Sequence, residues 1–144
     1  MSLLRLCGTV PEASRKITVI EAVGTMMEHK SGALAVMEGR NIIGVFTERD
    51  LMQRVVARRL DPETVRIGEV MTAPVISVEE TTQPVAAARI MRERHIRHLA
   101  VVDSAGAYKG LVALRFVLYH LMEELDAKVG ELYSYVMNDA PGGD

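Results

Sequence analysis

The stretch "GVFTERDL" at residues 44–51 has a counterpart in "GLVALRFVL" at residues 110–118. Each begins with a glycine and two apolar residues, and each runs into an apolar segment. The positions that differ most in chemistry form two matched pairs, Thr47 with Ala113 and Asp50 with Phe116. The chain therefore repeats one phrase, and the second copy lacks the polar side chains of the first.

The similarity extends on both sides of this phrase. Residues 34–52 align with residues 99–118 when one residue is inserted in a turn-like stretch, where an insertion is well tolerated. Residues 25–33 match residues 90–98 in position. Two copies fill nearly the whole chain, which is the signature of an internal structural repeat.

Both copies indicate the same order of elements: a short extended piece, a helix, a β-hairpin and a second helix. The extended pieces are expected at Thr9–Val10 and Ser77–Val78. Thr18 is a plausible N-cap of the first helix, and Pro84 suits the first turn of its counterpart. The expected helical stripe of the first copy is Val19, Val23, Met26, Met27 and Lys30.

Composition excludes several classes of protein. The chain has 144 residues, and 17 basic against 19 acidic side chains give a net charge of −2. This balance provides no general electrostatic attraction to nucleic acid or anionic lipid. No apolar run approaches the length of a membrane span, and the N-terminus does not resemble a signal peptide. Because Cys7 is the single cysteine, no intrachain disulfide can form, and we expect a cytoplasmic protein.

Three motifs in order, "GVFTERDL", "VMTAPVISV" and "RHIRHLAVVD", resemble the tandem CBS-domain pair, or Bateman module. The resemblance implies an α+β fold: two CBS units (β-α-β-β-α) packed sheet to sheet with pseudo-twofold symmetry, leaving two clefts. Such modules commonly bind adenosine-containing ligands and pair into flat dimers. The expected divisions are unit 1 at 5–60, a linker at 61–69, unit 2 at 70–125, a helical extension at 126–137 and a disordered tail at 138–144.

The segment "TERD", residues 47–50, has two interpretations. Thr47 followed three residues later by Asp50 is typical of a capping box at a helix start, although Glu or Gln is usual at the last place. The same turn directs free N–H groups at solvent, which suits a phosphate, and Arg49 adds a forked cation. A carboxylate can also accept both hydroxyls of a ribose. The resemblance favours nucleotide binding, which can coexist with capping.

On the family pattern, both copies contribute to the first cleft. The expected site residues are Thr47, Arg49, Asp50, Ile76, Ser77, Ile96, Arg97 and His98. The expected ligand is AMP, ADP, ATP or NAD, with S-adenosylmethionine as a further member of the class. His95 and His98 lie three apart, but without a cysteine or carboxylate pattern beside them we expect no metal site.

The second cleft departs from the family pattern. Ala113 has no hydroxyl with which to cap a helix, and Phe116 has no oxygen with which to hold a ribose. Arg115 remains, opposite residues 30–33. We therefore expect a degenerate second site.

Apolar residues also recur beyond the second copy. They are Leu118, Leu121, Leu125, Leu132 and Val136. Such a stripe is typical of a helix, and Gly130 is a place where it could break. The helix either packs on its own domain or contacts a second chain, and the sequence leaves both open.

No signature of catalysis accompanies the repeat. Motifs such as GxxxxGKS/T, GxGxxG, HExxH and GxSxG are missing from the sequence. We therefore expect a stand-alone regulatory module, not an enzyme, that binds an adenosine nucleotide and signals to an unidentified protein partner, as a homodimer. The alternative is a ligand-free dimerisation or interaction scaffold.

Overall fold

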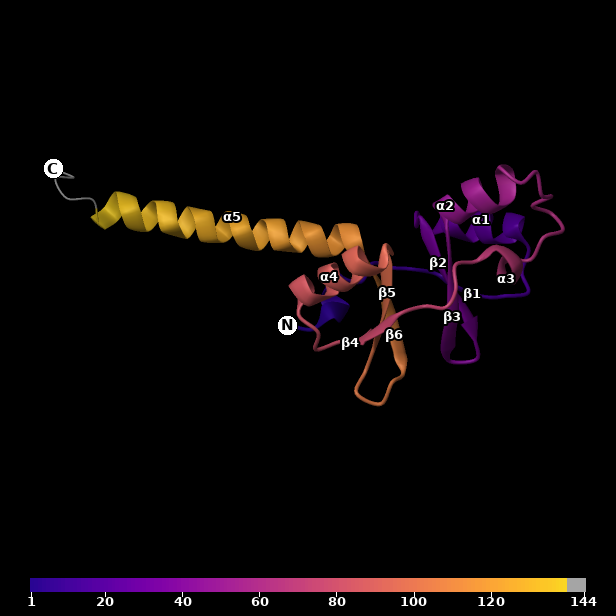
Figure 1. Cartoon of the computed structure of the whole chain (residues 1–144), viewed down its shortest axis with the longest axis horizontal. Helices are drawn as coiled ribbons and strands as arrows, with labels where there is room; N and C mark the ends of the chain where they lie inside the picture. The colour runs from indigo at the N-terminus through magenta and orange to yellow at the C-terminus, as the bar shows by residue number, and fades with distance from the viewer. Residues whose placement is uncertain (140–144) are drawn as a thin grey trace.

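The computed structural model describes residues 1–139 of the chain. It contains two three-stranded sheets beside each other, helices around them, and one long helix that projects from the body (Figure 1). The predicted α+β class with two units is confirmed. The first two residues of the predicted tail, 138 and 139, still belong to the long helix, and residues 140–144 lie outside the described residues.

The elements follow the predicted order in both copies. The helical elements are η1 (Leu3–Leu6), α1 (Val19–Glu28), α2 (Glu48–Asp50), the π-helical η2 (Leu51–Val56), α3 (Ile67–Val70), α4 (Pro84–Arg94) and α5 (Leu114–Asp139). The strands are β1 (Glu12–Ser14), β2 (Ala33–Glu38), β3 (Asn41–Thr47), β4 (Ser77–Glu79), β5 (His98–Val102) and β6 (Tyr108–Ala113).

The two sheets share one topology. The strand orders are β1-β2-β3 and β4-β5-β6, with the first pair parallel and the hairpin antiparallel in each. Even the irregularity is repeated, because the hairpin register shifts between Val36 and Met37 and again between Val101 and Val102. The repeat in sequence is therefore a repeat in backbone geometry.

Both helix starts agree with the sequence. The Thr18 hydroxyl accepts a hydrogen bond from the Glu21 backbone N–H at 3.3 Å, as an N-cap should. Pro84 is the first residue of α4, where its missing N–H costs no helical hydrogen bond. The two predicted helices thus begin where their start signals indicate.

Two local expectations are wrong. The first strand lies at Glu12–Ser14 and not at Thr9–Val10, because its partner β2 binds the chain from the Pro11 carbonyl onward. Helix α1 ends at Glu28, so Lys30 lies in the following turn, with a left-handed φ of 50° that stops the helix.

Each unit has its own apolar core, and a third cluster joins them. Phe46 is fully buried in the first core and Leu99 in the second. Between the sheets, Ala33 and Val45 from the first pack with Leu111 from the second. This cluster confirms sheet-to-sheet packing.

The segments that precede each sheet pack on the opposite unit. We call residues 3–8 and residues 67–72 the lead segments. Leu3 is fully buried in the core of the second unit, and its N–H donates to the Glu80 carbonyl at 2.8 Å. Ile67 is fully buried in the core of the first unit. Figure 1 accordingly places the N-terminus beside α4 and α3 beside the first sheet.

The glycine that opens each repeated phrase lies where a lead segment crosses a strand. A Cβ at Gly44 would collide with the Met71 side chain and lie 3.1 Å from the Thr72 carbonyl oxygen. A Cβ at Gly110 would lie 3.1 Å from the Cys7 sulfur. Both glycines therefore permit a close approach of chain to chain.

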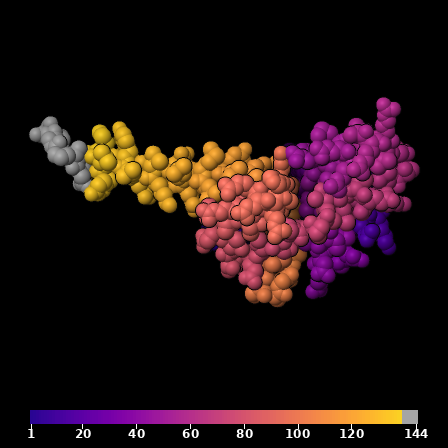
Figure 2. Space-filling view, in the orientation of Figure 1, coloured from indigo at the N-terminus to yellow at the C-terminus, as the bar shows by residue number. Residues whose placement is uncertain are grey.

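Helix α5 is continuous through Gly130 and is 26 residues long. Its first turns pack on η1 and α4, and Val117 belongs to the second core. Beyond these turns the helix extends away from both units (Figures 1 and 2). Among the described residues, no helix combines the length and apolarity needed to cross a membrane.

Candidate functional site

The first strand-to-helix turn, residues 47–50, is closed by reciprocal hydrogen bonds. The Thr47 hydroxyl accepts from the Asp50 backbone N–H at 3.2 Å. In return, one carboxylate oxygen of Asp50, Oδ2, accepts from the backbone N–H of Thr47 at 3.0 Å and from its hydroxyl at 3.1 Å. The predicted capping box is confirmed, with Asp in the place where Glu or Gln is usual.

The other carboxylate oxygen of Asp50 reaches the lead segment before β4. Oδ1 accepts a hydrogen bond of 2.8 Å from the Thr72 hydroxyl and lies 3.6 Å from Nε of Arg54. Arg54 in turn donates to the Met71 carbonyl at 2.7 Å. Asp50 is only 4% exposed, so this carboxylate joins the first turn to residues 71 and 72 from inside the fold.

The sequence did not identify Thr72 and Arg54 as partners of Asp50. Two signals were available. Arg54 follows Asp50 by four residues, which places both on one face of a helix. Thr72 lies within "VMTAPVISV", one of the motifs that carry the family resemblance. Its contact spans 22 positions, however, and only the folded chain brings it to the carboxylate.

His98 is the predicted site residue of the second copy that interacts electrostatically with the first turn. Burial lowers the pKa of His98 to about 4, and the positive charges of Arg115 and Arg97 act in the same direction, whereas Asp50 opposes them. The imidazole is therefore neutral at physiological pH. Asp50 and His98, from different copies, are close enough to influence each other.

The remaining predicted residues lie in the first turn, on β4, or just before β4 and β5. Arg49 is exposed in the first turn, and Ser77 is exposed in β4. Ile76 and Ile96 are partly buried against the second core. The Arg97 carbonyl accepts from the Leu114 N–H at 2.8 Å, at the start of α5. Ligand binding by the predicted set remains a prediction.

The second turn, residues 113–116, uses an aromatic ring where the first uses a carboxylate. A Cβ at Gly8 would lie 3.2 Å from a ring carbon of Phe116, so this ring covers the lead segment that precedes β1. The Arg115 guanidinium lies 5.0 Å from the centre of the same ring, within the range of a cation–π contact. Phe116 therefore occupies the place of Asp50 and leaves no acceptor for a ribose.

The Glu48 carboxylate lies beside Gly32, in the segment that the family resemblance assigns to the second cleft. The Glu48 N–H donates to the Gly32 carbonyl at 3.1 Å, and a Cβ at Gly32 would lie 3.2 Å from the Glu48 carboxylate carbon. The Ser31 hydroxyl donates to the Ala33 carbonyl at 2.7 Å. A carboxylate at this place does not favour a phosphate, and the degeneracy of the second site stays a prediction.

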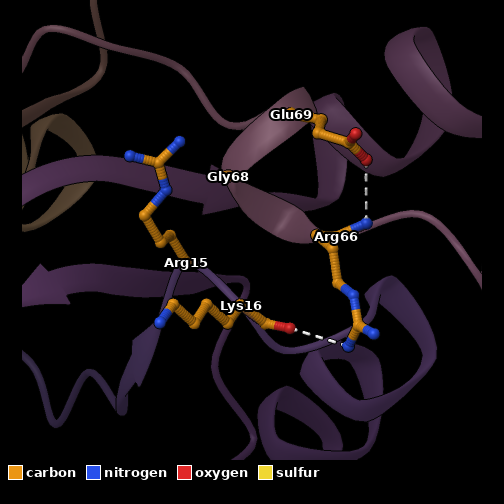
Figure 3. Close-up of a pocket in the computed structure, with 5 residues that line it drawn as sticks. All are labelled: Arg15, Lys16, Arg66, Gly68 and Glu69. Atoms are coloured by element: carbon orange, nitrogen blue, oxygen red, sulfur yellow. Dashed lines mark hydrogen bonds between the residues drawn. The ribbon is translucent and has the colours of Figure 1, made fainter.

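A hollow of about 400 Å³ lies elsewhere, between the loop after β1 and helix α3 (Figure 3). It is lined by Arg15, Lys16, Arg66, Gly68 and Glu69. Arg66 donates from its side chain to the Lys16 carbonyl at 2.8 Å and from its backbone N–H to the Glu69 carboxylate at 3.1 Å. The bond to Lys16 attaches α3 to the first unit, whereas the bond to Glu69 closes the first turn of α3. None of the predicted site residues lines the hollow.

Within the part of the chain that the structure describes, no group of three or more His, Cys, Asp or Glu side chains could hold a metal ion. The thiol of Cys7 is also a poor nucleophile, because burial raises its pKa to about 11.

Comparison with known proteins gives consistent matches. Residues 9–57 and 67–122 match the CBS domain family. The uncharacterized protein MK0525 of Methanopyrus kandleri is 34% identical over 102 residues, which cover 70% of this chain and about half (52%) of that protein. The chain thus spans only part of the length of this relative.

Solved structures share the fold. A protein with CBS domains from Burkholderia ambifaria aligns with a TM-score of 0.77 and 28% identity, covering 85% of this chain and 95% of that one. The CBS domain protein PAE2072 from Pyrobaculum aerophilum, complexed with AMP, aligns with a TM-score of 0.71 and 24% identity, covering 85% and 99%.

Proposed function

The chain belongs to the CBS-domain family, and from this premise we propose that it is a regulatory module that binds an adenosine-containing nucleotide beside its first turn. The ligand class comprises AMP, ADP, ATP, NAD and S-adenosylmethionine. The observation that carries the proposal is the carboxylate of Asp50, which is held among hydroxyl donors at a helix start and lies close to His98. The structural neighbour complexed with AMP supports the same ligand class.

The hydrogen bond from Thr72 to Asp50 is chemically equivalent to a ribose contact. In both, a hydroxyl donates to a carboxylate oxygen. A ribose that binds to Oδ1 replaces the Thr72 hydroxyl, which donates there at 2.8 Å in the structure described. Nucleotide binding then frees the Thr72 side chain from the first turn, and this local change beside residues 67–72 is the conformational signal.

The other predicted residues take roles that match their chemistry. Ile76 and Ile96 provide apolar walls for an adenine ring, and the neutral His98 adds an uncharged polar edge. The phosphate lies towards Arg49, which is exposed and free to swing, and the hydroxyl of Thr47. Ser77 and Arg97 border the cleft on the side of the second copy.

The output of the module is regulatory and not catalytic. We place the protein in the cytoplasm, as a homodimer that changes its affinity for a protein partner when the nucleotide binds. A ligand shifts such an equilibrium only if it prefers one of the two states, and the competition at Asp50 provides this preference.

The second candidate function is a ligand-free scaffold. It is favoured by the completeness of the hydrogen bonds around Asp50, which is 4% exposed and already has partners for both oxygens. In that case the carboxylate only caps α2 and joins the lead segment to the first unit.

Calorimetric titration with AMP, ATP, NAD and S-adenosylmethionine tests the proposal. We expect one of them to bind the wild-type protein and to lose at least tenfold in affinity with Asp50→Asn, whose amide keeps the shape but loses an acceptor. Thr72→Val removes the competing hydroxyl and should retain or increase affinity. At a hundredfold its Kd the ligand should stabilise the fold by about 2.7 kcal/mol.

The matched control is Phe116→Leu, at the equivalent position of the second turn, which should leave affinity unchanged. Equal losses in Asp50→Asn and Phe116→Leu would contradict the assignment to the first cleft. No binding of any of the four nucleotides, together with a lower melting temperature of Asp50→Asn, would establish the scaffold.

A further inference from the structure

The distal part of α5 carries an apolar face that its own chain does not cover. Val117 and Leu121 still pack against the second core. Residues 122–138 are all exposed, and the helix extends away from both units (Figures 1 and 2). In proteins, a helix is stabilised chiefly by packing of its apolar face, so this exposed face calls for a partner.

The exposed residues follow a strict heptad. Leu118, Leu125 and Leu132 recur every seven positions, and Met122, Val129 and Val136 recur every seven positions between them. All six side chains are between 44% and 63% exposed. The alternating spacings of four and three average 3.5 residues, the period of a left-handed coiled coil. We call these six residues the α5 seam.

The residue types of the α5 seam indicate the partner. With the three leucines at the d positions, the a positions hold Met122, Val129 and Val136. Leucine at d combined with β-branched residues at a favours a parallel pair of helices. A second copy of the same chain presents the same seam in the same register, so that the interface is self-complementary under twofold symmetry. The seam extends for about 27 Å along the helix.

The charges beside the α5 seam are compatible with this pairing. In a parallel pair, the g position of one helix faces the e position of the next heptad on the other. Lys128 then faces Tyr133 of the second copy and forms a cation–π contact with it, whereas Leu121, the preceding g residue, packs against the second core of its own chain. No like charges meet. Three acidic side chains of the helix, Glu123, Glu124 and Glu131, lie at outer positions.

We propose that α5 pairs with α5 of a second copy as a parallel, in-register, two-stranded coiled coil. The pairing holds the second units of two modules at the same end of the assembly. The pairing does not depend on nucleotide binding. It uses the α5 seam, which would stay exposed in a homodimer formed through other helices.

Disulfide trapping in the full-length chain tests the proposal, in a Cys7→Ala background that removes the native thiol. Leu132→Cys places a thiol in the seam, and Ser134→Cys places one two residues away on the outer face. Under mild oxidation we expect most of the first variant, and little of the second, to migrate as a covalent dimer. Equal trapping of both, or none of the first, would overturn the in-register pair.

A second pair of variants separates the seam from other dimer contacts. Adding Leu125→Glu to the Leu132→Cys variant should abolish trapping, whereas adding Ala127→Glu, on the outer face, should not. Light scattering of the wild-type protein gives its mass in parallel. If the protein is a dimer but Leu132→Cys is not trapped, the two chains pair through another surface. If the protein is a monomer, the α5 seam binds a different protein. Either result overturns the proposal but not nucleotide binding.

Discussion

The two strand-to-helix turns hold their lead segments by opposite chemistry. In the first turn, Asp50 accepts a hydrogen bond from Thr72 at 2.8 Å. In the second, the ring of Phe116 covers Gly8. The same backbone plan therefore tolerates a buried carboxylate or an aromatic ring at equivalent places. Because an apolar contact is sufficient to close the second turn, the polar atoms of the first are available for a further role, which we propose is nucleotide binding.

Gly44 and Gly110, where the lead segments cross the strands, offer the strongest test of whether the two copies are equivalent. Gly44→Ala should lower the free energy of unfolding by about 2–3 kcal/mol, because its Cβ meets the Met71 side chain and the Thr72 carbonyl. Gly110→Ala should cost about 1 kcal/mol, since its Cβ meets Cys7 at 3.1 Å. Urea unfolding measures both, and equal effects would show that the two crossings are equally tight.

Loss of the hydrogen bonds of Asp50 should give the next largest change in the free energy of unfolding. Asp50→Ala removes a cap and leaves the Thr47 N–H and the Thr72 hydroxyl without their acceptor, which should cost about 2 kcal/mol. Thr72→Val should cost about 1 kcal/mol. In chemical denaturation, the double variant should lose less unfolding free energy than the sum of the two single losses, because the two residues share one hydrogen bond. Strict additivity would mean that the bond contributes nothing.

The two copies also differ at His98, and the pH dependence of stability should reveal this difference. His98 has a folded pKa of about 4, lowered from an ordinary value of 6.5 by burial first and by Arg115 next, whereas its counterpart Ala33 cannot titrate. The unfolded chain binds the proton more readily, so the stability that comes from the neutral imidazole is complete above pH 6.5 and is lost as the pH falls towards 4.

His98→Gln should flatten this slope of unfolding free energy between pH 4 and 6.5. The imidazole resonances of the wild-type protein, followed by NMR, give the folded pKa directly. A folded pKa near 6.5 would mean that His98 is solvated, and the cleft would then be open and wet.

The smallest expected effect concerns the first helix of each copy. Gly24 lies in α1, where a Cβ would meet nothing within 4 Å, and Arg89 lies at the matching place in α4. Gly24→Ala should therefore raise the free energy of unfolding by about 0.5–1 kcal/mol. A loss in thermal or urea unfolding would indicate that a partner approaches the helix at this glycine.

The repeat, the hairpins, the helix starts at Thr18 and Pro84 and the capping box at Thr47 were all predictable from the sequence. These features depend on contacts between residues that are close along the chain, so spacing and residue type are sufficient to indicate them. The first strand was predicted to begin three residues too early, because its ends are set by its pairing with β2 and not by its own residues. The ligand residues of the cleft stay a prediction.

Only the tertiary structure decided how the two copies engage each other. The exchange of the lead segments, the bond from Thr72 to Asp50 and the packing of Phe116 on Gly8 all join residues that are distant along the chain. The sequence by itself determined that one copy has polar atoms where the other has none. The fold showed what those atoms contact, because chain crossings bring side chains together without leaving a periodic pattern in the sequence.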